Sequence, residues 1–220
     1  MGLELYLDLL SQPCRAVYIF AKKNRIPFEL RPVDLLKGGP RLGFGMGSYA
    51  SAPSALGAPF CPYFLAGRSC LQRCLCPGEP PEEGACFEGW RLHLGREVMF
   101  PVFLGEPVSP EMLAATLAEL DVTVQLLEDK FLQNKAFLIG PHISLADLVA
   151  ITELMHPVGA GCQVFEGRPK LAAWRQRVEA AVGEDLFQEA HEVIMKAKES
   201  PPADPTVKQK LMPAVLAMIG

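Results

Sequence analysis

The sequence of 220 residues predicts an incomplete α/β unit at the N-terminus and an all-α domain at the C-terminus. The first 35 residues or so follow the order strand, helix, strand, which is typical of a βαβ unit with parallel strands. From about residue 98 onward, apolar residues recur at helical spacing, and serine, proline and glycine mark helix ends. Between these parts the composition changes. The predicted divisions are therefore residues 1–37, 38–97 and 98–220.

The first strand is predicted from the alternation of apolar and polar residues over 3–9. A helix follows directly after Ser11 and runs to about Asn24. Serine is a favourable N-cap because its oxygen accepts a hydrogen bond from an unpaired backbone N–H of the first turn. Pro13 is tolerated in that turn, where its missing N–H costs little. This strand-to-helix junction is the first candidate for a functional position.

Residues 26–35 predict the second strand. Pro32 cannot donate to a strand ladder, so this strand is expected at a sheet edge. A βαβ unit with an edge strand and a helix N-terminus that favours anions suits a thioredoxin-like half domain. Since no further strand pattern follows, only the βαβ part of such a domain is predicted.

Ser11 has two interpretations. It acts as a helix cap only, or its hydroxyl also donates to an anion brought to the positive end of the helix. Spacing alone favours the cap.

The middle segment is predicted to be irregular. Residues 38–95 hold 11 of the 19 glycines, 7 of the 20 prolines and 5 of the 7 cysteines. Such a glycine and proline content is typical of low-complexity chain. Cys70, Cys74, Cys76 and Cys86 do not follow paired zinc-ligand spacing, so no metal site is predicted. We expect these cysteines to be reduced, oxidation-prone thiols.

Helices are predicted throughout the C-terminal part. The first lies near residue 99 and reaches a kink at Pro101. The next begins at Ser109, an N-cap before proline, and runs to about Leu132. Its predicted buried stripe consists of Leu113, Leu117, Leu120, Val124 and Leu127. Three later helices are predicted over 169–182, 184–198 and from about 204 onward, with Gly183 separating the first two.

A capping motif opens the helix that follows residue 143. Ser144 is the predicted cap, and Asp147 is expected to accept from the backbone N–H of Ser144, as in a capping box. Ile143 and Leu148 supply the hydrophobic staple. This helix is expected to end before Pro157. A catalytic pairing of Ser144 and Asp147 is the alternative, but the cap uses both side chains.

Composition limits the classes of partner. The formal net charge is −4, and no basic patch favours nucleic acid. No apolar run reaches the length of a membrane span, and no basic segment precedes an apolar run as in a signal peptide. A cytoplasmic protein is therefore expected. The four histidines share no ligand spacing, so no metal is expected there either, and Trp174 is expected in the core.

Residues 1–37 resemble the start of theta-class glutathione transferases, and the matching string is that of residues 1–24, MGLELYLDLLSQPCRAVYIFAKKN. The stretch 98–219 resembles the helical domain of the same class, including its long C-terminal extension, and the capping motif also occurs there. The resemblance implies that Ser11 is catalytic and donates a hydrogen bond to the glutathione sulfur, which favours the thiolate. Leu10 and Arg15 are the implied substrate-binding residues. Arg15 neutralises charge near the thiolate or is simply an exposed helix cation.

Glutathione is the implied co-substrate of small hydrophobic electrophiles, with no separate cofactor, and the implied assembly is a homodimer. Residues 38–97 depart from the family pattern. They contain neither the valine–proline turn that binds the glutathione backbone nor the glutamate–serine pair that binds its γ-glutamyl end. Two hypotheses therefore remain. The chain is a glutathione transferase with impaired glutathione contacts, or it is a non-catalytic helical scaffold derived from the same fold.

Overall fold

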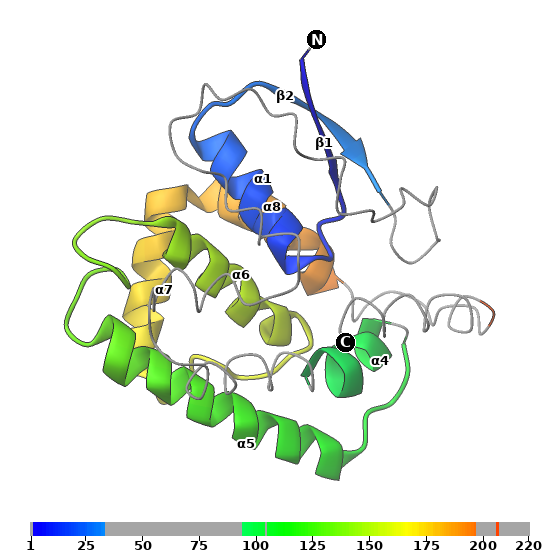
Figure 1. Cartoon of the computed structure of the whole chain (residues 1–220). Coiled ribbons are helices and arrows are strands. Elements are labelled where there is room, and N and C mark those ends of the chain that lie inside the picture. Colours follow the sequence, from blue (N-terminus) through cyan, green and yellow to red (C-terminus); the bar gives the residue numbers. More distant parts are fainter. Residues whose placement is uncertain (1, 34–93, 104, 197–205, 207–220) are drawn as a thin grey trace, which may run out of the picture.

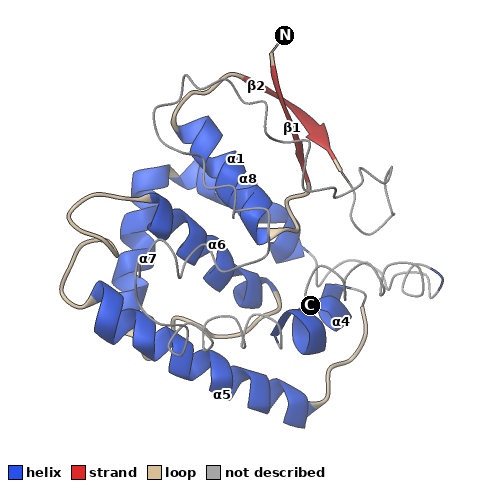
Figure 2. Ribbon diagram, in the orientation of Figure 1, coloured by secondary structure: helices blue, strands red, loops and turns tan. Residues whose placement is uncertain are grey.

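The computed structural model describes residues 2–33, 94–103, 105–196 and 206 (Figure 1). Two strands and one helix form the N-terminal unit, and helical elements make up the rest (Figure 2). In chain order they are β1 (Leu3–Leu7), α1 (Gln12–Lys23), β2 (Phe28–Pro32), η2 (Leu94–Met99), α4 (Phe100–Phe103), α5 (Pro110–Leu126), η3 (Leu127–Leu132), α6 (Leu145–Gly159), α7 (Pro169–Val182) and α8 (Glu184–Lys196), where η denotes a π-helical turn.

The N-terminal unit confirms the predicted parallel βαβ arrangement. Strands β1 and β2 pair in parallel from Leu3 opposite Phe28 to Leu7 opposite Pro32, and they are the two strands found in the described part of the chain. Strand β1 is two residues shorter than predicted. It ends at Leu7 because the next residue, Asp8, turns the chain by accepting from the backbone N–H of Leu10 at 2.9 Å.

Strand β2 also begins later than residue 26. The backbone N–H of Ile26 still donates to the carbonyl of Ala21 at 3.0 Å, so this residue closes helix α1 instead of opening the strand. Residues 34–35, the end of the predicted strand, lie outside the described residues.

The elements form layers, with the two strands outside, α1 beneath them, and α6 and α8 on the other side of α1 (Figure 1). Helix α6 is buried on nearly every side: all its residues are buried except Leu145 and Val158. The core continues from Ile19 of α1 through Ile151 of α6 to Trp174 of α7, each essentially without solvent exposure. One apolar core therefore joins the N-terminal unit to the helical domain.

Two predicted helix limits are wrong. In the segment described from Leu94 onward, η2 passes directly into α4, and α4 continues through Pro101 to Phe103. Pro101 therefore lies inside a continuous helical segment, where it removes one backbone donor without ending the helix. Helix α6 does not stop before Pro157 but runs to Gly159, because its close burial holds the last turn in place.

Other helix limits are as expected. Ser109 caps α5 by accepting from the backbone N–H of Met112 at 3.2 Å. In the predicted stripe of α5, Leu120, Val124 and Leu127 are buried, whereas Leu113 and Leu117 are half-buried. Helix α7 ends at Gly183, whose φ of 104° is a conformation that favours glycine.

The capping motif of α6 is present and does more than predicted. Asp147 Oδ2 accepts from the backbone N–H of Ser144 at 2.9 Å and from its hydroxyl at 2.5 Å. Asp147 Oδ1 accepts from the backbone N–H of Leu138 at 2.9 Å and from Trp174 Nε1 at 2.8 Å. Leu148 is buried in the core, and Ile143 is partly buried and packs against it. The fully buried carboxylate thus ties the preceding loop and α7 to the start of α6.

Several predictions fall on residues outside the described ones. These are the irregular segment over 38–93 with its cysteines, the end of the predicted helix at 197–198, and the helix from about 204, of which Thr206 alone is described. Within the described residues, Cys14 and Cys162 form no disulfide, and no group of three histidine, cysteine or acidic side chains is placed to hold a metal ion. The described helices include none long and apolar enough to cross a membrane.

Candidate functional site

Ser11 lies at the N-terminus of α1, directly after the turn that follows β1. Its backbone is extended, with φ −80° and ψ 129°, which is the conformation of an N-cap. Its side chain, however, makes no hydrogen bond to the backbone of the helix. The predicted position is therefore confirmed, whereas the predicted capping bond is wrong. Ser11 is half-buried, and its hydroxyl makes no bond to the backbone of the first turn of α1.

The turn that carries Ser11 is held at both ends. The backbone N–H of Ser11 donates to the carbonyl of Asp8 at 3.0 Å, and the carbonyl of Ser11 accepts from the backbone N–H of Arg15 at 3.1 Å. The carboxylate of Asp8 also holds the backbone N–H of Leu10. These bonds fix the backbone of Ser11 and do not involve its side chain.

The electrostatics at this helix end favour an anion. The first turn of α1 contains no acidic residue that would neutralise the positive end of the helix. The side chain of Ser11 also interacts with the thiol of Cys14, three residues further along the chain. Burial raises the pKa of the Cys14 thiol, and a hydrogen bond from the side chain of Ser11 opposes that rise. The charge of Asp8 raises the same pKa, and the charge of Arg15 lowers it.

Arg15 is a buried residue, so the exposed-cation interpretation is wrong. Its side chain has 0% exposure, and its Nη1 donates to the carbonyls of Leu9 at 2.8 Å and Leu10 at 2.9 Å. Burial lowers the pKa of Arg15 to about 10, which leaves the guanidinium charged at neutral pH. Leu10 is half-buried and packs against the core. Substrate binding by Leu10 and Arg15 stays a prediction.

The structure brings residues of α6 to this site that the sequence did not reveal. Arg15 Nη2 donates to the carbonyl of Thr152 at 2.9 Å and lies 3.2 Å from Nδ1 of His156. The charge of Glu153, which is 7% exposed, raises the pKa of Arg15 against the effect of burial. Because some 140 residues separate these partners, no local pattern indicated them.

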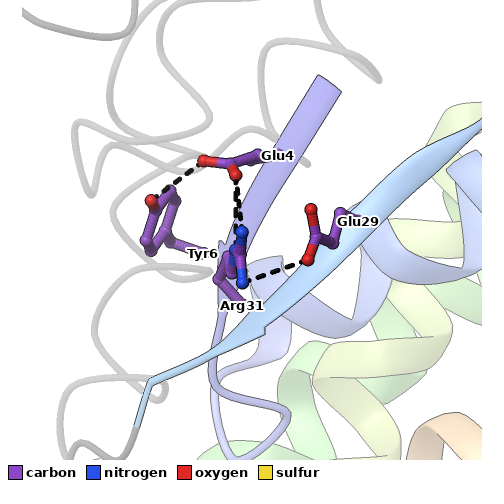
Figure 3. A network of polar contacts seen from close by, with 4 residues as sticks. All are labelled: Glu4, Tyr6, Glu29 and Arg31. Atoms are coloured by element: carbon purple, nitrogen blue, oxygen red, sulfur yellow. Dashed lines mark hydrogen bonds and ion pairs between the residues drawn. The ribbon is translucent and has the colours of Figure 1, made fainter. Parts of the chain in front are cut away.

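A second polar cluster lies on the exposed face of the sheet (Figure 3). Arg31 pairs with Glu4 at 2.9 Å and with Glu29 at 3.0 Å, and the hydroxyl of Tyr6 donates to Glu4 at 3.0 Å. The hydrogen bond from Arg31 is the main reason that the pKa of Glu4 is lowered. All four side chains are exposed, and such surface pairs contribute little to stability. The cluster faces away from α1 and takes no part in the Ser11 site.

Comparisons with known proteins agree on one family. The family model for the C-terminal domain of glutathione S-transferases matches residues 92–181. The chain is 65% identical to glutathione S-transferase theta-1 of Homo sapiens, and the alignment covers 100% of both chains. The apo form of human glutathione-S-transferase T1-1 matches with a TM-score of 0.72 and 62% identity over 100% of each chain.

A theta-class glutathione transferase from human, solved with the glutathione conjugate of 1-menaphthyl sulfate, also matches. It shares 37% identity and a TM-score of 0.69, over 100% of this chain and 98% of that one.

Proposed function

Because the chain belongs to the theta class of glutathione S-transferases, we propose that it joins glutathione to small hydrophobic electrophiles, with Ser11 as its catalytic residue. The supporting observation is the Ser11 hydroxyl, held at the N-terminus of α1 and making no bond to the helix backbone. A donor at that place stabilises a thiolate, and so does the positive end of the helix.

The proposed reaction needs no further group from the protein. The glutathione thiol loses its proton to solvent, and the hydroxyl of Ser11 donates a hydrogen bond to the resulting thiolate. A free thiol has a pKa of about 8.5, so this stabilisation increases the reactive fraction at neutral pH. With an alkyl halide, the sulfur forms a bond to carbon as the bond from carbon to halogen breaks and halide leaves.

The partners belong to the same proposal. The related human structure in complex with a glutathione conjugate supports glutathione as the co-substrate. We further propose a homodimer in the cytoplasm, as expected for the family, with no metal or other cofactor. Leu10 and Arg15 complete the site, Leu10 through its place in the turn and Arg15 through the contacts described above.

A non-catalytic scaffold is the second candidate function. It is favoured by the sequence of residues 38–97, which contains neither family motif for the glutathione backbone and its γ-glutamyl end. A hydrogen bond to a charged group contributes about 1.5–3 kcal/mol. The loss of two such bonds weakens binding on the order of a hundredfold or more. On this alternative the helical domain remains as a platform for other proteins.

Calorimetric titration with glutathione, combined with turnover of a small alkyl halide, separates the two candidates. The transferase proposal predicts binding and turnover that disappears in Ser11→Ala. Ser109→Ala is the matched control, because it also removes a serine hydroxyl at a helix N-terminus and should keep full turnover. Folded protein that shows neither heat nor turnover would exclude the transferase and leave the scaffold.

A further inference from the structure

Arg15 connects two parts of the molecule that come from opposite halves of the sequence. Its Nη1 holds the carbonyls of Leu9 and Leu10, the two residues before Ser11, at 2.8 and 2.9 Å. Its Nη2 reaches helix α6, where it donates to the carbonyl of Thr152 at 2.9 Å. The two ends of one planar group thus touch the turn that carries Ser11 and the central helix of the C-terminal domain.

This arrangement requires arginine and not merely a positive charge. A guanidinium presents several donors in a rigid plane, so separate nitrogens serve the two elements at once. A lysine ammonium is a single point on a flexible stem and does not reach both with the same geometry. Complete burial makes the group costly unless its donors are used, and Arg15 uses both terminal nitrogens, although its buried Nε has no hydrogen-bond partner among the described residues.

His156 extends the connection along α6. Its Nδ1 lies 3.2 Å from Arg15 Nη2, and a guanidinium has no acceptor, so Nδ1 must accept and the ring proton resides on Nε2. Asparagine places its amide oxygen near the position of Nδ1, whereas leucine has a similar size and offers no acceptor. The two substitutions therefore separate the hydrogen bond from the packing.

We propose that Arg15 is a positioning residue that couples helix α6 to the Ser11 hydroxyl. The carbonyls of Leu9 and Leu10 belong to the peptide planes that lead into Ser11, so fixing them fixes where the hydroxyl points. A hydrogen bond weakens steeply when its angle or length departs from the normal range, and the turn must therefore be held closely. This inference rests on the proposed function of Ser11, and it assigns control of that residue to the other domain.

Cys14 provides a measurement that does not depend on glutathione. It is half-buried one turn into α1, and the side chain of Ser11 contacts its sulfur. The variants are Arg15→Lys, His156→Leu and His156→Asn, with Lys22→Met as the control because Lys22 is an exposed cation on the same helix. Each is checked for folding by circular dichroism, and Cys14 is then alkylated under native conditions and quantified by peptide mass spectrometry.

Arg15→Lys and His156→Leu are expected to speed the alkylation of Cys14 about tenfold, the factor that follows from about 1.4 kcal/mol of lost local stability. His156→Asn and Lys22→Met should stay near the wild-type rate. In the glutathione complex, Arg15→Lys and His156→Leu should also raise the pH midpoint of thiolate formation. His156→Asn should keep the midpoint of the wild type. A merely structural role would not move that midpoint.

The coupling is refuted if folded Arg15→Lys and His156→Leu keep both the alkylation rate and the thiolate midpoint of the wild type. It is also refuted if His156→Asn behaves like His156→Leu, because the hydrogen bond would then be irrelevant. If the wild type binds no glutathione, the proposed role of Ser11 fails, while the alkylation rates alone still decide whether α6 holds the turn.

Discussion

The buried carboxylate of Asp147 is expected to be among the most sensitive positions for stability. It accepts four hydrogen bonds, from the backbone and hydroxyl of Ser144, the backbone of Leu138 and the indole of Trp174. Asp147→Ala leaves the donors of Leu138 and Trp174 buried without an acceptor, each at a cost of about 1–3 kcal/mol. Loss of the capping interaction adds about 1 kcal/mol. The total, about 3–7 kcal/mol, is a large part of the 5–15 kcal/mol typical of a whole domain.

Urea unfolding followed by circular dichroism measures this cost. For a chain of this length about 4 kcal/mol corresponds to a fall of about 8–16 °C in the melting temperature. Asp185→Ala is the control, since Asp185 is an exposed acid in the first turn of α8 and should cost under about 1 kcal/mol. Trp174→Phe should cost less than Asp147→Ala and couple to it in a double-mutant cycle. The reasoning fails if Asp147→Ala costs no more than the control, or if the two substitutions are additive.

Three further substitutions test other parts of the structure. Asp8→Asn keeps a side-chain oxygen that accepts from the backbone N–H of Leu10, but it removes the negative charge that raises the pKa of Cys14. The pH midpoint of Cys14 alkylation should therefore fall, and an unchanged midpoint would contradict this prediction. Gly159→Ala places a Cβ 2.8 Å from the carbonyl oxygen of Ile194. The free energy of unfolding, measured with urea, should therefore fall by about 1–3 kcal/mol. An unchanged free energy would show that α6 and α8 are not in close contact. Burial lowers the pKa of His191 from 6.5 to about 3, so this residue contributes stability that is present above pH 6.5 and lost as the pH falls toward 3. The unfolding free energy of His191→Gln should therefore vary less with pH over this interval than that of the wild type, and equal slopes would refute the assignment.

Local patterns predicted those features that depend on neighbouring residues. Three features are each formed by residues a few positions apart in the sequence. They are the cap at Ser109, the capping box of Ser144 and Asp147, and the end of α7 at Gly183. Each follows from a side chain that meets the free backbone groups of a helix end, which a sequence displays directly.

Features that depend on distant residues were missed. The acceptor role of Asp147 toward Trp174 spans 27 residues, and the contact of Arg15 with His156 spans 141. The sequence predicts a helix stop at Pro157 because proline is locally unfavourable in a helix, whereas the burial of α6 on nearly all sides outweighs that cost. The missing capping bond of Ser11 likewise emerged from the structure, since the spacing alone favoured a simple cap.

The pH at which bound glutathione becomes a thiolate tests the central claim most directly. It is read from the ultraviolet absorbance of the thiolate in complexes of glutathione with the wild type, Ser11→Ala and the control Ser109→Ala. The hydroxyl of Ser11 should hold the midpoint below the value of about 8.5 for a free thiol, in the wild type and in Ser109→Ala alike. Ser11→Ala should return the midpoint toward that value. The same midpoint in all three complexes would contradict the assignment of Ser11 as the thiolate-stabilising residue.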